Sequence, residues 1–451
     1  MAHTAAVRDF TQGNITKQIA EFALPLFLSN LLQIVYHMVD MMIVGNVLGE
    51  IGLSAVSVGG DIVNFMTFFC IGFAGAAQVI IARYVGAKQQ DQVDRFIGTM
   101  SGFLLASAIL ISAVCIVLRE PLLQIMNTPA ESYDEALRYA TICMIGLVFI
   151  YGYNIVSTIL RGMGDSRHPF LFISIAAVMN LMLDVLFVIV LRRGAGGAAL
   201  ATVISQSFSF LCGLVFLFRQ RKRFFPMLCP AAFFRWDRAM LADLIGLGLP
   251  MAIKSAAIQF SKLFTNAWIN SYGVNVSAFS GIANKLNSVS NLIMNAVNTA
   301  GATMIGQNLG AEKYQRVKQI LWRLFAVTLT AAAILSAAVC LFPDEIFGSF
   351  TKEPGVLAIA REYLLIAVLT FFGSACRAVM NALINGSGRH RINFITAILD
   401  GFVMRIGLAL LFGLGFQMEY IGFWLGDALA RFTPVVIGGI FLVSGRWRKK
   451  I

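Results

Sequence analysis

The chain has 451 residues, of which 58% are hydrophobic and only 13% are charged, whereas a typical soluble domain has about 25% charged residues. This composition excludes a soluble globular protein and indicates an integral membrane protein with about twelve apolar runs of spanning length. The formal net charge of +12 does not indicate nucleic-acid binding, because most Lys and Arg residues lie at the termini and at alternate connections. That distribution follows the positive-inside rule, so we expect both termini on the cytoplasmic side of the plasma (inner) membrane.

The first half of the chain predicts six helices. The first contains Pro25, which removes a backbone hydrogen bond and permits a bend. A cytoplasmic amphipathic connection is expected between the second helix and the third, over 83–95. The expected helices are 16–45, 52–82, 96–118, 136–160, a fifth that contains 177–190, and a sixth from 194 to 218.

The pattern of the first half recurs in the second half. The recurring pairs are Leu24-Pro25 with Leu249-Pro250, Gly86-Ala87 with Gly310-Ala311, and Gly162 with Gly386. Because each half holds an even number of helices, both halves have the same orientation in the membrane, as in parallel repeats. We therefore predict an all-α polytopic membrane protein with twelve transmembrane helices in two pseudo-symmetric six-helix lobes. The lobes are 1–218 and 239–451, and the basic segment 219–238 is the linker between them.

Two acids stand inside apolar runs of the first lobe. Asp184 lies in the stretch AVMNLMLDVLFVIV with no opposite charge nearby in the sequence, and Asp40 lies in the first helix. A charge at the centre of a spanning helix costs about 2.5 to 3.5 kcal/mol on insertion scales, so such an acid is a functional candidate. Asn180 lies four residues before Asp184, on the same helical face. The corresponding positions of the second half hold Thr265, Met404 and Leu408.

We interpret Asp40 and Asp184 as a proton or sodium site. Two carboxylates in a low-dielectric site favour a shared proton, and oxygen ligands suit a hard cation. Asn180 is one further oxygen donor, and Thr202, four residues after Ala198, is another. The alternative is that each acid is neutral, or bonded to a hydroxyl or an amide, and holds helices together.

Two other polar residues of the first lobe are candidates for a substrate cleft. His37 lies three residues before Asp40 and could relay protons, although a lone His in a helix is more often a packing residue. Asp61 either lines the cleft or lies near the outer membrane interface.

The second lobe is basic. Its intramembrane cations are Lys254, Lys262, Lys285, Arg377, Arg405 and Arg431, with Asp400 and Asp427 as possible counterions. We expect Asp427 to pair with Arg431, four residues later, whereas the five-residue separation of Asp400 and Arg405 predicts different helical faces. The remaining cations either line a water-filled cavity for anionic groups or extend to the interface, as Lys254 could. The candidates for a cleft are therefore Lys262, Lys285, Arg377 and Arg405.

Taken together, these motifs resemble the multidrug and toxic compound extrusion (MATE) family of secondary transporters over nearly the whole chain. The stretches that carry the resemblance are LPLFLSNLLQIVYHMVDMMIVGNVLG, RGMGDSRHPF, NLMLDVLFV and GAGGAALAT. The resemblance implies two lobes around a central cleft that opens alternately outward and inward, exporting organic compounds in exchange for protons or sodium. It also implies a cation site at Asp40, Asn180, Asp184, Thr202 and the backbone of Ala198, with Pro25 as the bend point.

The sequence thus predicts an ion-coupled antiporter with no cofactor other than its coupling ion, a small-molecule substrate and lipid as partners, and a monomeric state. In the seventh helix Lys254 and Lys262 replace the acid of some family members. The alternative is therefore a flippase or exporter of anionic lipid-linked or metabolite substrates that uses the basic lobe. A membrane enzyme is disfavoured, because His168 and His390 lack carboxylate partners of catalytic spacing.

Overall fold

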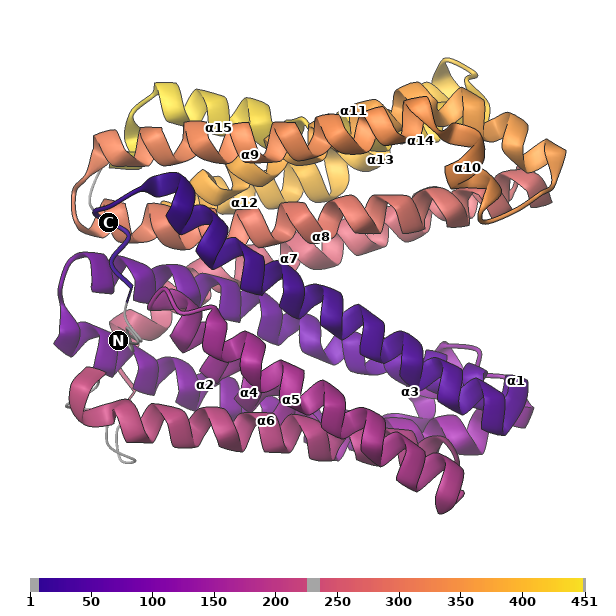
Figure 1. The fold of residues 1–451 in the computed structure, drawn as a ribbon, viewed down its shortest axis with the longest axis horizontal. Coiled ribbons are helices and arrows are strands. Elements are labelled where there is room, and N and C mark those ends of the chain that lie inside the picture. The colour runs from indigo at the N-terminus through magenta and orange to yellow at the C-terminus, as the bar shows by residue number, and fades with distance from the viewer. Residues whose placement is uncertain (1–7, 225–235, 449–451) are drawn as a thin grey trace. The chain divides into compact units, whose positions relative to one another are not determined.

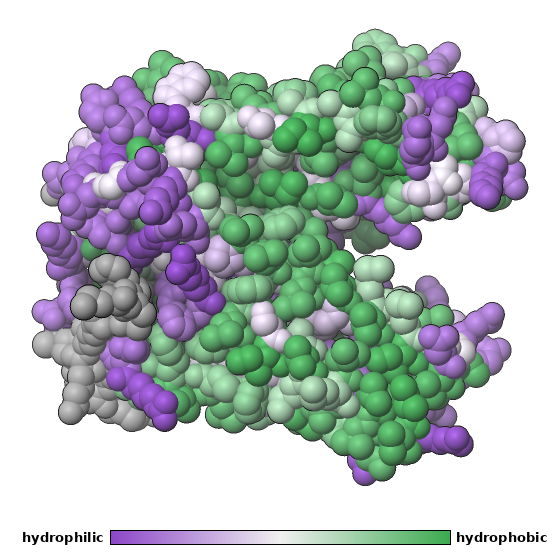
Figure 2. Space-filling view, viewed as in Figure 1, coloured by the Kyte–Doolittle hydropathy of each residue, from purple (hydrophilic) through white to green (hydrophobic). Residues whose placement is uncertain are grey.

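The computed structural model describes residues 8–224 and 236–448, and every regular element within those ranges is a helix (Figure 1). Ten of the helices are long and apolar enough to cross a membrane. Hydrophobic side chains cover the middle of each part of the molecule, while hydrophilic ones gather at the ends (Figure 2). Many large apolar side chains are exposed, including those of Phe65 and Val443, and the Val443 side chain is 88% exposed. The chain is therefore an integral membrane protein, as its composition predicts.

The first helix contains two membrane spans. Helix α1 (Ile15–Gly86) has 72 residues and would be about 108 Å long at 1.5 Å per residue, more than twice the hydrocarbon thickness of about 30 Å. It is interrupted at Gly49, whose φ of 63° and ψ of −150° are not helical. A positive φ costs glycine little, because glycine has no Cβ. The first two predicted helices are thus separated at Gly49.

Helix α8 (Val274–Gly310) is long enough to span but too polar to count among the ten. Together with the second half of α1 it brings the spans within the described residues to the predicted twelve.

Contacts divide the chain into two compact units. Unit 1 comprises Met1–Arg8 and Leu24–Ile245, and unit 2 comprises Asp9–Ala23 and Gly246–Ile451. Helix α1 and helix α7 (Arg238–Asn270) therefore each contribute to both units, with Pro25 and Pro250 shortly after the division. Of the expected linker, the first part continues helix α6 as far as Phe224, and 225–235 lies outside the described residues.

In unit 1, helix α4 packs on α2 and α6, and α5 packs on α6. The expected connection over 83–95 is shorter in the structure, because α1 and α2 continue into it and leave a turn over 87–89, where Lys88 has φ 58°. The remaining elements of this unit are α2 (Gln90–Val117), α3 (Arg119–Ile125), the 3-10 helix η1 (Ala130–Ser132), α4 (Tyr133–Gly162), α5 (Arg167–Asp184), the π-helix η2 (Val185–Val190) and α6 (Gly194–Phe224).

In unit 2, helix α11 packs on α8, α9, α14 and α15. The segment that follows α11 contains two π-helices. The elements of this unit, besides α7 and α8, are α9 (Tyr314–Leu341), α10 (Pro343–Gly348), α11 (Pro354–Gly386), α12 (His390–Ile398), the π-helix η4 (Leu399–Val403), α13 (Met404–Leu410), the π-helix η5 (Leu411–Gly415), α14 (Glu419–Ala430), α15 (Thr433–Val443) and the 3-10 helix η6 (Arg446–Arg448).

Two glycines let α14 approach the preceding segment closely. A Cβ on Gly422 would lie 2.5 Å from the backbone carbon and oxygen of Phe412, and a Cβ on Gly426 would lie 2.5 Å from the backbone of Ala409. Glycines four residues apart on one helix face are a common means of close packing between membrane helices. The neighbouring atoms are backbone, so they cannot turn aside as a side chain would.

Substituting Gly422→Ala is therefore expected to destabilise unit 2 by roughly 1 to 3 kcal/mol, the usual cost of overpacking. Thermal unfolding followed by tryptophan fluorescence should report a lower midpoint. The matched control is Gly439→Ala in α15, where an added Cβ meets nothing within 4 Å. A Gly422→Ala midpoint equal to that of the control would refute the backbone contact.

The segment before α1 is fixed to unit 2 by hydrogen bonds. The backbone N–H of Phe10 donates to Oε1 of Gln307 at 2.9 Å. The carbonyl oxygen of Phe10 accepts from Nε of Arg316 at 2.9 Å, and that of Gly13 accepts from Arg316 Nη2 at 2.8 Å. Arg316 thus connects α9 with the chain that leads into the first span.

We expect Arg316→Ala to release this segment. Hydrogen exchange of the backbone amides over 9–23 should then accelerate by about tenfold, because hydrogen bonds to a charged group contribute about 1.5 to 3 kcal/mol each and these are partly exposed. Arg323→Ala, an exposed change on the same helix, is the control. Equal protection in both variants would contradict the prediction.

Candidate functional site

A buried polar cluster lies in unit 1 where α1, α5 and α6 supply side chains. Asp40 comes from α1, Asn180 and Asp184 come from α5, and all three are at most 3% exposed. Nδ2 of Asn180 lies 3.5 Å from Oγ1 of Thr202 on α6, at the long limit of a hydrogen bond. Asp40 and Asp184 lie close enough to interact by Coulomb repulsion. The structure therefore brings together the side chains that the sequence singled out.

The helix geometry changes at this cluster. Asp184 is the last residue of α5, and the π-helix η2 begins at the next residue. Such π-helical insertions are rare and are frequent at functional sites. Ala198, one turn before Thr202 on α6, is fully buried.

Each carboxylate of the cluster has an unsatisfied oxygen. Oδ1 of Asp40 and Oδ1 of Asp184 are buried and accept no hydrogen bond. Among residues 8–224 and 236–448, neither acid has a Lys or Arg within ion-pair distance. Buried polar atoms almost always have a partner, so these two oxygens require one. A proton or a hard cation with oxygen ligands fits this donor set.

The sequence analysis missed Tyr139 of α4. Its phenol interacts electrostatically with both Asp40 and Asp184. The ring is buried against α1, since a Cβ on Gly59 would lie 2.3 Å from Cδ1 of Tyr139. The internal repeat could have identified Tyr139, because the corresponding position 224 residues later is also a tyrosine, Tyr363.

His37 and Asp61 are exposed. The ring of His37 contacts that of Tyr36, with 4.4 Å between the centroids. No contact within the described residues joins His37 or Asp61 to the two buried acids.

Within residues 236–448, the second repeat has no equivalent acidic cluster. Thr265 is buried at the position of Asp40. At the positions of Ala198 and Thr202 stand Gly422 and Gly426, which pack directly against backbone. At these positions the second repeat has close contacts between helix backbones, whereas the first repeat has polar side chains nearby.

Unit 2 instead holds a buried ionic network around Asp400. This carboxylate is fully buried and lies 3.0 Å from Nη2 of Arg377, 3.4 Å from Nη2 of Arg405 and 3.8 Å from Nζ of Lys254. Lys254 also donates to Oδ1 of Asn381 at 2.7 Å. The expectation that Lys254 could extend to the interface is therefore wrong, because its ammonium group is held inside the unit.

The pairing of Asp400 with Arg405 contradicts the expectation that they occupy different faces. The expectation assumed an α-helix, but η4 (Leu399–Val403) is a π-helix, in which residues five apart lie on one face. Arg405 also pairs with Asp427. The predicted pair of Asp427 and Arg431 is confirmed at 2.9 Å.

The other two basic candidates of unit 2 differ in position. Lys262 on α7 is half-buried and lies within electrostatic range of Asp427, Arg431, Arg405 and Arg377. Lys285 on α8 is exposed. The network therefore includes Arg377 and Arg405, has Lys262 at its edge, and does not include Lys285.

Helix α8 carries a polar stripe that the sequence analysis also missed. Its members repeat at intervals of three or four residues, so they share one helix face, and all are exposed or half-buried. In a membrane such side chains face water or protein and not lipid. The residues are Asn284, Ser288, Asn291, Asn295 and Asn298.

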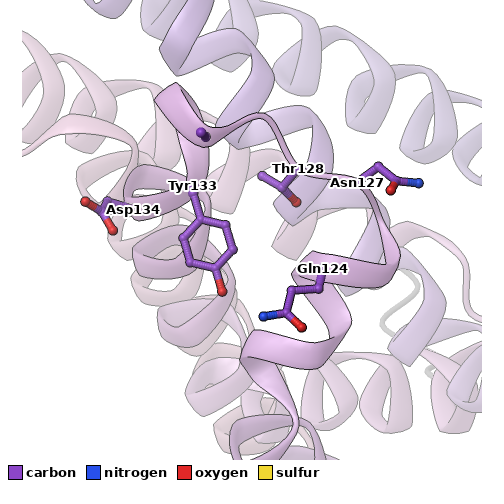
Figure 3. Close-up of a pocket in the computed structure, with 6 residues that line it drawn as sticks. Gln124, Asn127, Thr128, Tyr133 and Asp134 are labelled. Atoms are coloured by element: carbon purple, nitrogen blue, oxygen red, sulfur yellow. The ribbon is translucent and has the colours of Figure 1, made fainter.

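A separate pocket lies at the turn between α3 and α4. Figure 3 shows Gln124 and Tyr133 facing the hollow from two sides, with Asn127 and Asp134 turned outward. Thr128 and Ala130 complete its lining. None of the residues predicted from the sequence lines this pocket.

His168 has a carboxylate neighbour in the structure, because its Nδ1 bonds to Asp165, three residues earlier on the chain. Oδ1 of Asp165 also accepts from the backbone N–H groups of Arg167 and His168, at 3.0 and 3.1 Å. Asp165 therefore caps the start of α5, which is a structural role.

Comparison with known proteins agrees with this architecture. The model of the MatE family matches residues 25–186 and 250–411, one match in each repeat. The chain is 29% identical, over 98% of its length and 97% of the relative's, to the "Probable multidrug resistance protein YpnP" of Bacillus subtilis.

Two solved structures share the fold. One, described as "Crystal structure of MATE in the bent conformation", has a TM-score of 0.87 and 22% identity, covering 96% of this chain and 97% of that chain. Another, in "the straight conformation", has a TM-score of 0.85 and 22% identity, covering 97% of each chain.

Proposed function

The chain belongs to the MatE family of multidrug efflux transporters, and from that premise we propose that it is an ion-coupled antiporter that exports organic compounds by alternating access. The observation that carries the proposal is the buried pair Asp40 and Asp184, with one unsatisfied oxygen on each carboxylate. At the corresponding positions of the second repeat stand Thr265 and Leu408. A polar group retained in one repeat and absent from the other is better explained by function than by packing.

The coupling ion is a proton or sodium. The two carboxylates repel each other, and a proton or sodium ion bound between them removes that repulsion. For sodium, the amide oxygen of Asn180, the hydroxyl of Thr202 and the backbone of Ala198 supply further oxygen ligands. For a proton, one carboxylate becomes a donor to the other.

Movement of α1 links the ion site to the transport cycle. Asp40 and Pro25 lie on the same helix, and α1 contributes residues to both compact units, with the division directly before Leu24. Pro25 weakens the helix at this point. Ion binding at Asp40 then favours one of two conformations of α1, bent or straight at Pro25. The substrate is released because this change alters the side of the membrane to which the transporter is open. Related proteins have been solved in bent and straight conformations.

The proposal includes the remaining expectations from the sequence. The protein transports a small molecule and catalyses no covalent reaction, and it resides in the plasma membrane as a monomer. Both termini lie in the cytoplasm, because the basic residues gather at the termini and at alternate connections.

The test is transport in proteoliposomes under an imposed pH gradient or an imposed sodium gradient. One pH unit provides about 1.4 kcal/mol per proton, and 100 mV provides about 2.3 kcal/mol per charge. We expect one of the two gradients to drive accumulation of a cationic dye against its concentration gradient. Equal dye levels with and without each gradient would reject ion coupling.

The second candidate is an exporter or flippase of anionic substrates, and the ionic network around Asp400 favours it. Cells that lack the protein would then accumulate a polyprenyl-linked precursor. Normal lipid pools in such cells count against this candidate.

A further inference from the structure

The ionic network of unit 2 carries more positive than negative charge. Its two carboxylates are Asp400 and Asp427, and its five cations are Lys254, Lys262, Arg377, Arg405 and Arg431. With every group ionised, three positive charges are not balanced within the described residues. Taking charge out of water is costly unless it is paired, so a network that served packing alone would be expected to balance.

Two of these cations have hydrogen-bond donors without an acceptor among the described residues. Nε of Arg405 is buried and has no acceptor, although the side chain is only 2% exposed. Lys262 forms no hydrogen bond or ion pair with any described residue, yet it lies within electrostatic range of Asp427. An ammonium group has three donors and a guanidinium group has five. Both features call for an anionic acceptor that the described residues do not supply.

The network is not completely enclosed. The side chains of Asp427, Arg377 and Lys254 are 24%, 18% and 13% exposed, whereas Asp400, with which Arg377 and Lys254 pair, is fully buried. Lys262 is half-buried. These partly exposed groups are therefore accessible to a solute. Guanidinium groups match the paired oxygens of carboxylates and phosphates, so the chemistry of the network suits an oxyanion.

We propose that this network binds an oxyanion, namely the carboxylate or phosphate group of a transported compound. Lys262 donates to the oxyanion, and Asp400 and Asp427 hold the guanidinium groups of Arg377, Arg405 and Arg431 in position. The inference rests on the proposed export function and deepens it, because it names the chemical group that the second repeat recognises.

The test is an equilibrium titration of the full chain in neutral detergent with two dyes, a rhodamine that has a free carboxylate and its methyl ester. Fluorescence anisotropy should show that the wild type binds the carboxylate dye about tenfold more tightly, because the ester has no anionic oxygen to accept charge-assisted hydrogen bonds. Lys262→Gln should remove most of this preference without changing the affinity for the ester. That variant breaks no ion pair, and Lys352→Gln, an exposed charge in the same unit, is the matched control.

Equal affinity of the wild type for both dyes would overturn the proposal, as would an unchanged preference in Lys262→Gln. A repeat in phosphatidylcholine nanodiscs with and without phosphatidylglycerol separates the two sources of an oxyanion. Loss of the preference on adding phosphatidylglycerol would assign the site to lipid phosphate and refute binding of a transported compound. No ion gradient is applied in this titration, so Asp184→Asn should keep the preference for the carboxylate dye. A failure of ion coupling is therefore distinguishable from a failure of oxyanion binding.

Discussion

Replacing Asp184 with asparagine is expected to abolish gradient-driven transport while the protein stays folded. Asparagine has nearly the same size and still forms hydrogen bonds, but it neither releases a proton nor carries the charge that attracts sodium. In the wild type, one proton exchanged per compound across one pH unit supports about tenfold accumulation. The variant should show no accumulation above the level without a gradient, measured as dye uptake into proteoliposomes. Asp40→Asn should give the same result, because interacting carboxylates titrate as one site.

The control for this prediction is Asp91→Asn, an exposed acid of the first unit at the start of α2. It should transport like the wild type. Equal melting temperatures of the variants would show that lost transport does not reflect unfolding. If Asp184→Asn accumulated the dye as well as the wild type does, Asp184 would serve only to hold helices together. Other residues would then have to couple transport to the ion.

The acidic cluster was predictable because its signal is local. An acid within an apolar run is conspicuous in any membrane sequence, and the repeat supplies an internal comparison that identifies Asp40 and Asp184 as features of one half. The involvement of Tyr139 was not predicted, because a tyrosine within an apolar helix is common. Its position beside two carboxylates depends on how α4 packs against α1 and α5, which no pattern within α4 encodes.

The ionic network shows a different limit of sequence analysis. The pairing of Asp427 with Arg431 follows from helical periodicity, so it was predicted. The pairing of Asp400 with Arg405 depends on the π-helix η4, and a pattern analysis that assumes 3.6 residues per turn excludes it. The place of Lys254 in this network depends on Asn381, which lies 127 residues away. Long-range contacts of this kind require the packed structure.

The division of the chain between the compact units likewise depends on tertiary contacts. The sequence predicts boundaries in the basic segment 219–238, where the composition changes. The structure divides the chain within α1 and α7 instead. In α1 the residues before Leu24 belong to unit 2, and the segment around Phe10 is bound there to Gln307 and Arg316. Both helices contain a proline, Pro25 in α1 and Pro250 in α7, shortly after the residue at which the helix passes from unit 2 to unit 1 or from unit 1 to unit 2.

Replacing Asp400 with asparagine is expected to destabilise the protein strongly. Asp400 is fully buried and neutralises part of the charge of Arg377, Arg405 and Lys254. Removing one partner of a buried ionic network leaves uncompensated charge inside the protein, which costs about 3 to 5 kcal/mol. Thermal unfolding in detergent at a fixed scan rate should therefore show a much lower midpoint.

The matched control is Asp344→Asn, which breaks the ion pair with Arg361 at 3.4 Å on the surface of the same unit, where the two side chains are 68% and 71% exposed. Exposed pairs contribute about 0 to 1 kcal/mol, so this midpoint should hardly change. The double variant Asp400→Asn with Arg377→Gln removes an acid and a base together and should recover part of the loss, since coupled residues are not additive. If Asp400→Asn melted like Asp344→Asn, the three cations would not depend on this carboxylate, and another anion would have to neutralise them.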